Sequence, residues 1–307
     1  MQRWESATRR VLHDTAPSKR SSELEASVAL LHAAVAARGV VHMGSDAARA
    51  YGLEAEDSPW RPICCLVEGV SHHLTGDPDV AEVRLLDGVR RGAVAAPNIQ
   101  TLCLAQLALV AADREDWESA AGFSSRALAQ VEHYALRVFP TSALVFAVSA
   151  MIRARRGRAD EAQSDAREAR ELLDTLTDFL PWYEVETRLA LASAAVRLGD
   201  APGARELIAG AEQFARRIPE ATLLHGWITR TAEQLDAADA GATLLTTAEL
   251  RVLGFLPTHL SFREIADRLY VSANTVKTQA HAVYRKLDAA SRSEAVTRAT
   301  QLGLLGF

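Results

Sequence analysis

The spacing of apolar residues predicts a chain that is helical from about residue 20 to residue 235. Apolar positions recur at intervals of three and four residues, and no stretch alternates apolar and polar residues over several β-branched positions. This periodicity places apolar side chains on one face of each helix, whereas a half-buried strand needs strict alternation. The sequence therefore predicts an all-α fold without a parallel sheet.

Four segments of this region share a pattern that repeats after about 40 residues. Small side chains two helical turns apart let a neighbouring helix approach closely, as stacked helical hairpins require. Each segment has such a pair, namely Ala81 with Gly88, Ala120 with Ala127, Ala162 with Ala169, and Ala204 with Ala211. Prolines stand near the expected starts of the partner helices, at Pro62, Pro97, Pro140, Pro181 and Pro219. Residues 20 to 235 thus resemble the tetratricopeptide-like repeats in the C-terminal half of large MalT-like regulators, and an irregular helical bundle is the alternative.

The segment after this region is rich in small and polar residues and contains Gly241. Such composition is typical of a linker between domains. We therefore expect a helical repeat domain over residues 1–235, a linker over 236–243 and a second domain over 244–307.

Four short helices are predicted in the second domain. Three of them begin with a hydroxyl residue that is followed by a glutamate three positions later, which is the pattern of a capping box. The pairs are Thr246 with Glu249, Ser261 with Glu264, and Ser291 with Glu294. The helix after Ser272 has no acid in its first turns, and this favours an anion at its N-terminus.

That third helix, residues 273–287, has one apolar stripe and one polar face. Val276, Ala280, Val283 and Leu287 follow the spacing of a buried stripe. The remaining face has hydroxyls, an amide and cations and no acid, and two of the three lysines of the chain, Lys277 and Lys286, lie on this helix. A helix with such a face has the right chemistry to enter the major groove of DNA.

The stretch LTTAELRVLGFLPTHLSFREIADRLYVSANTVKTQAHAVYRKLDAASRSEAV resembles the LuxR-type helix-turn-helix. The resemblance rests on the acidic first helix, EIA-x-x-L in the second, S-x-x-TVK before the third and R-x-EAV in the fourth. It implies that the chain binds double-stranded DNA as a homodimer. The same resemblance implies three roles. Base edges are faced by Lys277, Thr278 and His281, and phosphates are contacted by Ser272, Thr275, Arg285 and Lys286. The last helix pairs two subunits through Val296 and its neighbours. Gln279 and His259 depart from the family, which often has histidine and glycine at these positions.

The distribution of charge along the chain agrees with a DNA-binding second domain. The 307-residue chain has a net charge of −5, but residues 240 to 307 carry +3 and the rest carries −8. A basic tail on an acidic body suggests that only the tail meets a polyanion.

Other functional classes find little support in the sequence. No G-x-S-x-G, H-E-x-x-H or Cys-x-x-Cys motif occurs, so we expect neither an enzyme nor a cofactor. Outside the tail the single lysine is Lys19, in a stretch without glycine, which excludes a phosphate-binding loop. The strands of a receiver or lactone-binding domain are also missing. A cluster of Cys64, Cys65, His72 and His73 is a weak candidate for a metal site, since buried thiols explain it as well.

We expect a cytoplasmic protein that associates with the nucleoid, because no segment resembles a signal peptide or a membrane span. The helical repeats could bind a protein or a small effector, or could serve dimerisation. The aromatic residues that could line such a groove are Trp60, Trp117, Trp182, Tyr183 and Trp227, although core packing suits most of them. The alternative function is a protein-interaction scaffold in which the DNA-binding tail is an accessory.

Overall fold

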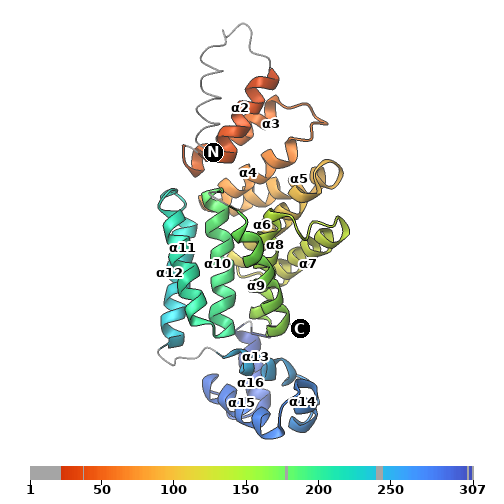
Figure 1. Ribbon diagram of the computed structural model, residues 1–307, viewed down its shortest axis with the longest axis vertical. Coiled ribbons are helices and arrows are strands. Elements are labelled where there is room, and N and C mark those ends of the chain that lie inside the picture. The colour runs from red at the N-terminus through yellow and green to blue at the C-terminus, as the bar shows by residue number, and fades with distance from the viewer. Residues whose placement is uncertain (1–21, 37, 177–178, 240–244, 303, 306–307) are drawn as a thin grey trace.

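The computed structural model describes residues 22–36, 38–176, 179–239, 245–302 and 304–305. In these residues it contains fifteen α-helices, one short 3₁₀-helix and no strand, which confirms the all-α class. Figure 1 shows a long array of helices above a smaller unit of four helices. None of the helices in the described ranges is both long and apolar enough to cross a lipid bilayer.

The array consists of helical hairpins that stack side by side. Consecutive helices pack as pairs, and the first helices of successive pairs also contact one another, from α4 through α6 and α8 to α10 (Figure 1). The helices of the array are α2 (Ser22–Val35), α3 (Val40–Leu53), α4 (Arg61–Leu74), α5 (Pro78–Ala95), α6 (Pro97–Asp113), α7 (Trp117–His133), α8 (Ala143–Arg155), α9 (Ala159–Asp174), α10 (Pro181–Leu198), α11 (Ala201–Ala215) and α12 (Thr222–Asp239), with the 3₁₀-helix η2 (Pro140–Ser142) before α8. The last helix, α12, packs on α10 and α11 and also reaches α4.

The eight small residues of the repeat lie where the helices of a hairpin meet. They occupy α5, α7, α9 and α11, which are the second helices of four hairpins, and all eight are buried. At Gly88 a Cβ atom would lie only 2.6 Å from the sulfur of Cys103 on α6, so no larger residue fits without displacement. Close helix packing therefore depends on these positions. The classification of the hairpins as tetratricopeptide-like stays a prediction.

The second unit contains α13 (Thr247–Phe255), α14 (Phe262–Leu269), α15 (Ala273–Lys286) and α16 (Arg292–Gln301). It has a hydrophobic core of its own, to which all four helices contribute. Of the predicted linker, residues 236–239 belong to α12, whereas residues 240–243 lie outside the described part of the chain.

The unit touches the array through α13. The hydroxyl of Thr247 donates a hydrogen bond to the carbonyl of Leu198 at the end of α10. Arg251 forms an ion pair with Asp160 at the start of α9, with 3.4 Å between the charged atoms. The turn at Gly157, between α8 and α9, lies directly against the backbone of the unit. The ends of α8, α9 and α10 thus form the seat of the C-terminal unit.

A buried polar pair lies in the core of the array. Glu186 on α10 is 1% exposed and accepts a hydrogen bond from the amide of Gln106 on α6, which is fully buried. Burial disfavours the charged carboxylate and raises the pKa of Glu186 to about 8. Glu186 is therefore a neutral carboxyl group in the folded protein at neutral pH.

This shift predicts a pH-dependent stability. An unfolded glutamate titrates near pH 4.3, so between that pH and about 8 the folded chain holds a proton that the unfolded chain has lost. The free energy of unfolding should then fall by about 1.4 kcal/mol per pH unit from this group, as pH rises towards 8. Glu186→Gln removes this slope. We therefore expect the free energy of unfolding of the variant, relative to that of the natural protein, to rise by about 2 kcal/mol from pH 6 to pH 8. Urea denaturation at the two pH values measures this difference. A gain that matches that of the exposed control Glu171→Gln would contradict the assignment.

Candidate nucleic-acid interface

Helices α14 and α15 form a helix-turn-helix. Helix α14 ends at Leu269, and Tyr270 then takes a left-handed conformation with φ of 54°. The amide of Val271 bonds back to the carbonyl of Ala266 at 3.1 Å, and Ser272 already caps the next helix. The turn between the helices is thus only three residues long, so the two helices are held in one fixed arrangement.

The helix starts follow the predicted capping pattern, with one difference. Capping boxes are present at Thr246 with Glu249 and at Ser261 with Glu264. At the start of α16 the hydroxyl of Ser291 accepts from the amide of Glu294 at 3.2 Å, but the carboxylate of Glu294 accepts from the amide of Ala290, one residue earlier than a capping box requires.

The start of α15 differs from the others, as predicted. The hydroxyl of Ser272 accepts a hydrogen bond from the amide of Thr275 at 3.1 Å, and no acidic residue stands in the first turn. The positive end of the helix dipole is therefore not neutralised within the helix.

The two faces of α15 divide as the sequence predicts. Val276, Ala280 and Val283 have no exposed surface, and Leu287 has 3%. The predicted base-reading residues Lys277, Thr278 and His281 are all exposed. Among the predicted phosphate contacts, Ser272 and Arg285 are exposed, whereas Thr275 and Lys286 are half-buried.

The cations of this face are not equivalent. Within the part of the chain that the structure describes, no carboxylate lies within ion-pair distance of Lys277 or Arg285, so both charges are available to a ligand. Lys286 instead pairs with Glu249 of α13 at 2.7 Å, and the carboxylate is nearly buried. Lys286 therefore also ties α15 to α13.

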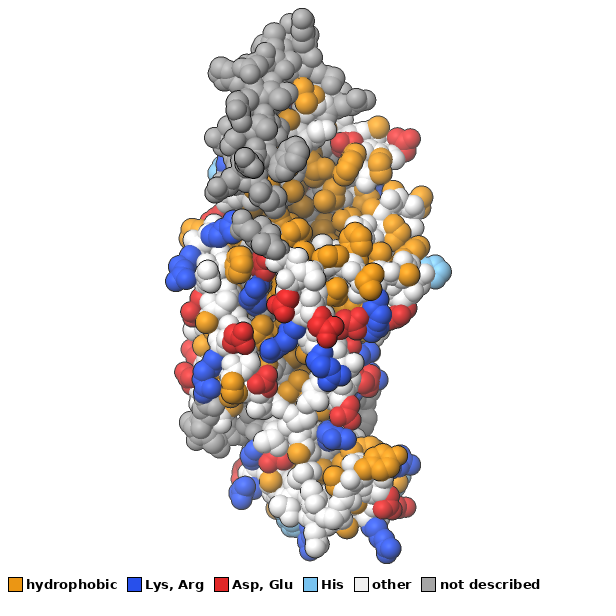
Figure 2. Space-filling model, in the orientation of Figure 1, with side chains coloured by type: hydrophobic (Ala, Val, Ile, Leu, Met, Phe, Trp, Pro, Cys, Tyr) orange, Lys and Arg blue, Asp and Glu red, His pale blue; other side chains and the backbone are white. Residues whose placement is uncertain are grey.

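The helical array leaves the polar face of α15 uncovered. Helix α13 packs on α15 with one side and on α9 and α10 with another, so the exposed face of α15 points away from the array. Figure 1 shows α15 at the far end of the molecule, and Figure 2 shows cationic side chains at this tip. A duplex can approach this face without displacing any described helix of the array.

Arg292 is a key residue that the sequence analysis did not single out. Its guanidinium donates to four backbone carbonyls in and after the last turn of α13, at distances of 2.7 to 3.2 Å. The acceptors are those of Phe255, Leu256, Thr258 and Leu260. The available signal was the arginine of the R-x-EAV motif. Arg292 fixes the loop before α14 and thereby the position of the helix-turn-helix.

The other candidates from the sequence lie in the array. The thiols of Cys64 and Cys65 are buried, and burial raises the pKa of each to about 12. Among the residues that the structure describes, no three His, Cys, Asp or Glu side chains are grouped so that they could hold a metal ion. His73 is buried as well, whereas His72 lies 3.5 Å from a carboxylate oxygen of Asp77.

The five aromatic residues fall into three groups. Trp182 and Tyr183 are in the core, and Trp60 is 58% exposed. Trp117 and Trp227 line a pocket on the array.

Comparison with known proteins agrees with the geometry of the C-terminal unit. Residues 243–299 match the family model of bacterial regulatory proteins of the luxR family, so α13 to α16 form a LuxR-type helix-turn-helix domain. The chain is 36% identical over 77 residues to an uncharacterized transcriptional regulatory protein, YxjL, of Bacillus subtilis. It is 46% identical over 63 residues to the transcriptional regulatory protein YdfI of the same organism. These matches cover 25% and 20% of this chain, and 35% and 30% of the respective relatives, so the chain spans about a third of the length of the curated relatives it matches.

Removal of Arg292 should destabilise the C-terminal domain. Arg292→Ala leaves three partly buried carbonyls and one exposed carbonyl without their donor, and we expect the free energy of unfolding to fall by about 3 kcal/mol. Arg292→Lys should recover less than half of this loss, because an ammonium has three donors and cannot match the planar fork of arginine. Urea denaturation of the full-length chain measures both. The control is Arg298→Ala on the same helix, whose partners Asp288 and Glu294 lie at the surface, with an expected change of at most about 0.5 kcal/mol. Equal losses for the alanine variants would contradict the assigned role.

Proposed function

We propose that this protein is a transcription regulator that binds a specific DNA sequence by placing α15 in the major groove. The observation that carries the proposal is the exposed, acid-free, cationic face of α15, which is the second helix of the helix-turn-helix and the third helix of a LuxR-type domain. Helix α15 has 14 residues, and the diameter of an α-helix suits the width of the major groove.

Base reading is assigned to Lys277, Thr278 and His281. These side chains lie on consecutive turns of the exposed face. A lysine at this place can donate to N7 and O6 of guanine, and a good base contact contributes about 1 to 3 kcal/mol of discrimination. The positions of these three residues make them the source of sequence preference in our proposal.

Phosphate contacts are assigned to Ser272, Thr275, Arg285 and Lys286. The first two stand at the uncompensated N-terminus of α15, where an anion is favoured. Lys286 is bonded to Glu249, but an ammonium has three donors, so one can remain on Glu249 while another meets a phosphate. These residues supply affinity without sequence information.

Two further roles complete the proposal. Helix α16, through Val296 and its neighbours, pairs two subunits on DNA; Val296 is only partly buried by the core of its own domain. The helical array, with no enzymatic activity, serves as the module that binds an effector or partner or contributes to dimerisation. The regulator then works in the cytoplasm at the nucleoid.

Sedimentation with and without bound DNA tests the pairing of subunits by α16. We expect two chains on each DNA site.

Two substitutions separate sequence reading from general affinity. After a site has been selected from a random DNA pool, Lys277→Ala should bind selected and scrambled duplexes with the same affinity. Arg285→Ala should weaken binding to both and lower the slope of log affinity against log salt by about one counterion. Gel-shift titrations at two salt concentrations measure both effects.

The matched control is Arg167→Ala, which removes an exposed arginine of α9 in the array. It should leave affinity, preference and salt slope unchanged. Indistinguishable behaviour of the Lys277 and Arg285 variants would overturn the assigned roles, and failure of the natural protein to bind DNA at low salt would overturn the proposed function.

A further inference from the structure

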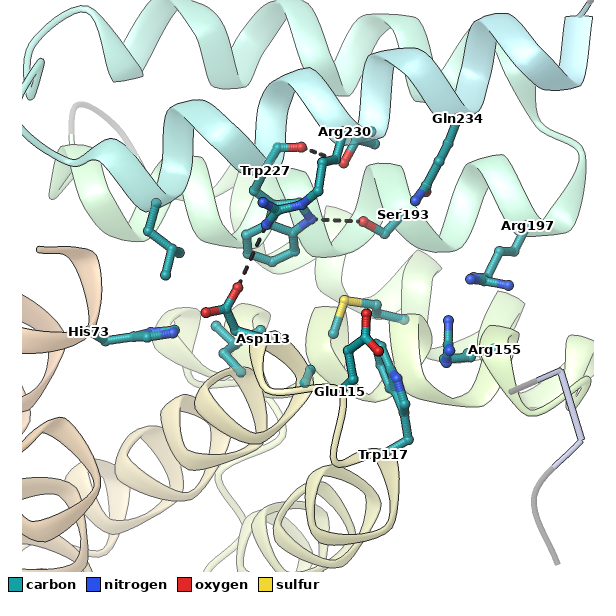
Figure 3. A pocket seen from close by; sticks show the side chains of 15 residues that line it. His73, Asp113, Glu115, Trp117, Arg155, Ser193, Arg197, Trp227, Arg230 and Gln234 are labelled. Atoms are coloured by element: carbon teal, nitrogen blue, oxygen red, sulfur yellow. Dashed lines mark hydrogen bonds and ion pairs between the residues drawn. The ribbon is translucent and has the colours of Figure 1, made fainter. Parts of the chain in front are cut away.

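A pocket of about 350 Å³ opens on the array, where α12 lies across the first helices of the hairpins. Its walls come from α4, α6, α8, α10 and α12 and from the start of α7, and Figure 3 shows their side chains converging on one space. This volume lies in the range of sites for small organic molecules.

Two arginines form one end of the pocket. Arg155 is the last residue of α8 and Arg197 is the penultimate residue of α10, and the two helices pack together (Figure 3). Burial and the neighbouring charge of Arg155 lower the pKa of Arg197 to about 10. The folded chain thus holds two partly buried like charges side by side, which is costly unless an anion compensates them.

The described part of the chain supplies no such anion. No carboxylate there lies within 4 Å of the charged atoms of Arg155 or Arg197, and Nε of Arg155 is buried without a hydrogen-bond partner. Other arginines of the same helices do have partners: Arg153 of α8 pairs with Asp165 and Arg188 of α10 pairs with Glu184. Among the described residues, the absence of a paired acid therefore distinguishes Arg155 and Arg197 from the other arginines of α8 and α10.

The acids that line the pocket do not fill this role. Asp113 pairs with Arg230 of α12, with 3.6 Å between the charged atoms. Glu115 attracts Arg155 through space, but it is exposed on the turn before α7 and makes no ion pair with it. The partial negative charge at the C-terminal ends of α8 and α10 is weaker than that of a carboxylate.

The rest of the lining suits a flat, apolar body. The guanidinium of Arg155 lies 3.9 Å from the centre of the Trp117 ring, and the indole nitrogen of Trp117 is a second buried donor without an acceptor. Trp227 of α12 is held in place by a hydrogen bond from its indole nitrogen to the hydroxyl of Ser193 at 3.2 Å. The pocket therefore combines aromatic walls with donors that lack acceptors.

We propose that this pocket binds a small organic anion, whose carboxylate or phosphate oxygens accept hydrogen bonds from Arg155 and Arg197 and whose body packs against Trp117 and Trp227. Oxyanions match the fork of a guanidinium, and charge-assisted hydrogen bonds are the strong ones. Binding also relieves the repulsion between the two arginines.

The position of this anion site gives it a route to the DNA-binding domain. Leu198, whose carbonyl accepts the hydrogen bond from Thr247, follows Arg197 directly. Gly157, two residues after Arg155, lies against the carbonyls of Leu250 and Leu304. The anion thus contacts the two helix ends on which the domain is seated, and it regulates DNA binding from there. This regulatory step rests on the proposed function, whereas the anion site does not.

Calorimetry on the full-length chain tests the anion site, in a buffer free of carboxylate, phosphate and sulfate. The probes are benzoate, inorganic phosphate and the neutral analogue benzamide. We expect saturable binding of at least one of the two anions, affinity about tenfold lower in Arg197→Met, and no change in the control Arg167→Met. Benzamide should bind more weakly than benzoate. Failure of both anions to bind, or equal binding by Arg197→Met, would overturn the site.

Thermal unfolding separates a ligand-binding arginine from a structural one. Without an anion, Arg197→Met should unfold at a higher temperature than the natural protein, because it removes a desolvated and repelled charge. With a saturating anion, the natural protein should gain stability and the variant should gain less. A variant that unfolds at a lower temperature without anion and gains as much with it would show that Arg197 is merely structural.

The regulatory step has its own measurement. DNA affinity with and without the bound anion should differ by about fivefold in the natural protein and not differ in Arg197→Met. Unchanged DNA affinity, together with anion binding in the calorimeter, would overturn the regulatory step alone. Absence of DNA binding under both conditions would overturn the proposed function and leave the anion site standing.

Discussion

The recognition surface is usable because one helix, α13, separates it from the array. Helix α13 gives one side to the core of its own domain, against α15, and another to the ends of α9 and α10. The buried stripe of α15 must therefore face towards the array, and its polar face must point away from it. Burial of Val276, Ala280 and Val283 in the domain core and exposure of Lys277 are two results of this single arrangement.

The array contributes a seat and a charged pocket, and both use the ends of the same helices. Small residues let the helices of the hairpins pack closely, and α8 and α10 lie against each other. The C-terminal domain contacts these helix ends through Thr247 and through the backbone that packs on Gly157. Arg155 and Arg197 lie at the same helix ends and line the pocket. A charge that enters the pocket therefore acts within two residues of the docking contacts. This proximity is the physical basis for linking the two proposed functions of the protein.

Local patterns predicted the helices and their faces, but not the contacts between distant residues. The capping boxes at Thr246 and Ser261 and the buried stripe of α15 depend on neighbours within a few positions, and the sequence contains that information. The ion pair of Lys286 with Glu249 and the four carbonyls bound by Arg292 join residues more than 30 positions apart, and helical periodicity does not specify such partners. The pocket is a stronger case, since its lining extends from His73 to Gln234. The sequence identified the aromatic residues as candidates for a groove. Only the packing of α12 across the array brings Trp117 and Trp227 into the same pocket.

Hydrogen exchange of the full-length chain, with and without a selected DNA duplex, tests most directly whether the free face of α15 meets DNA while α13 keeps its seat. We predict slower exchange on DNA binding in peptides from residues 271–287. Peptides from residues 247–256 and from the turns at residues 155–160 and 197–201 should exchange as before. Protection confined to those turns and to residues 247–256, with residues 271–287 unchanged, would show that DNA binds elsewhere.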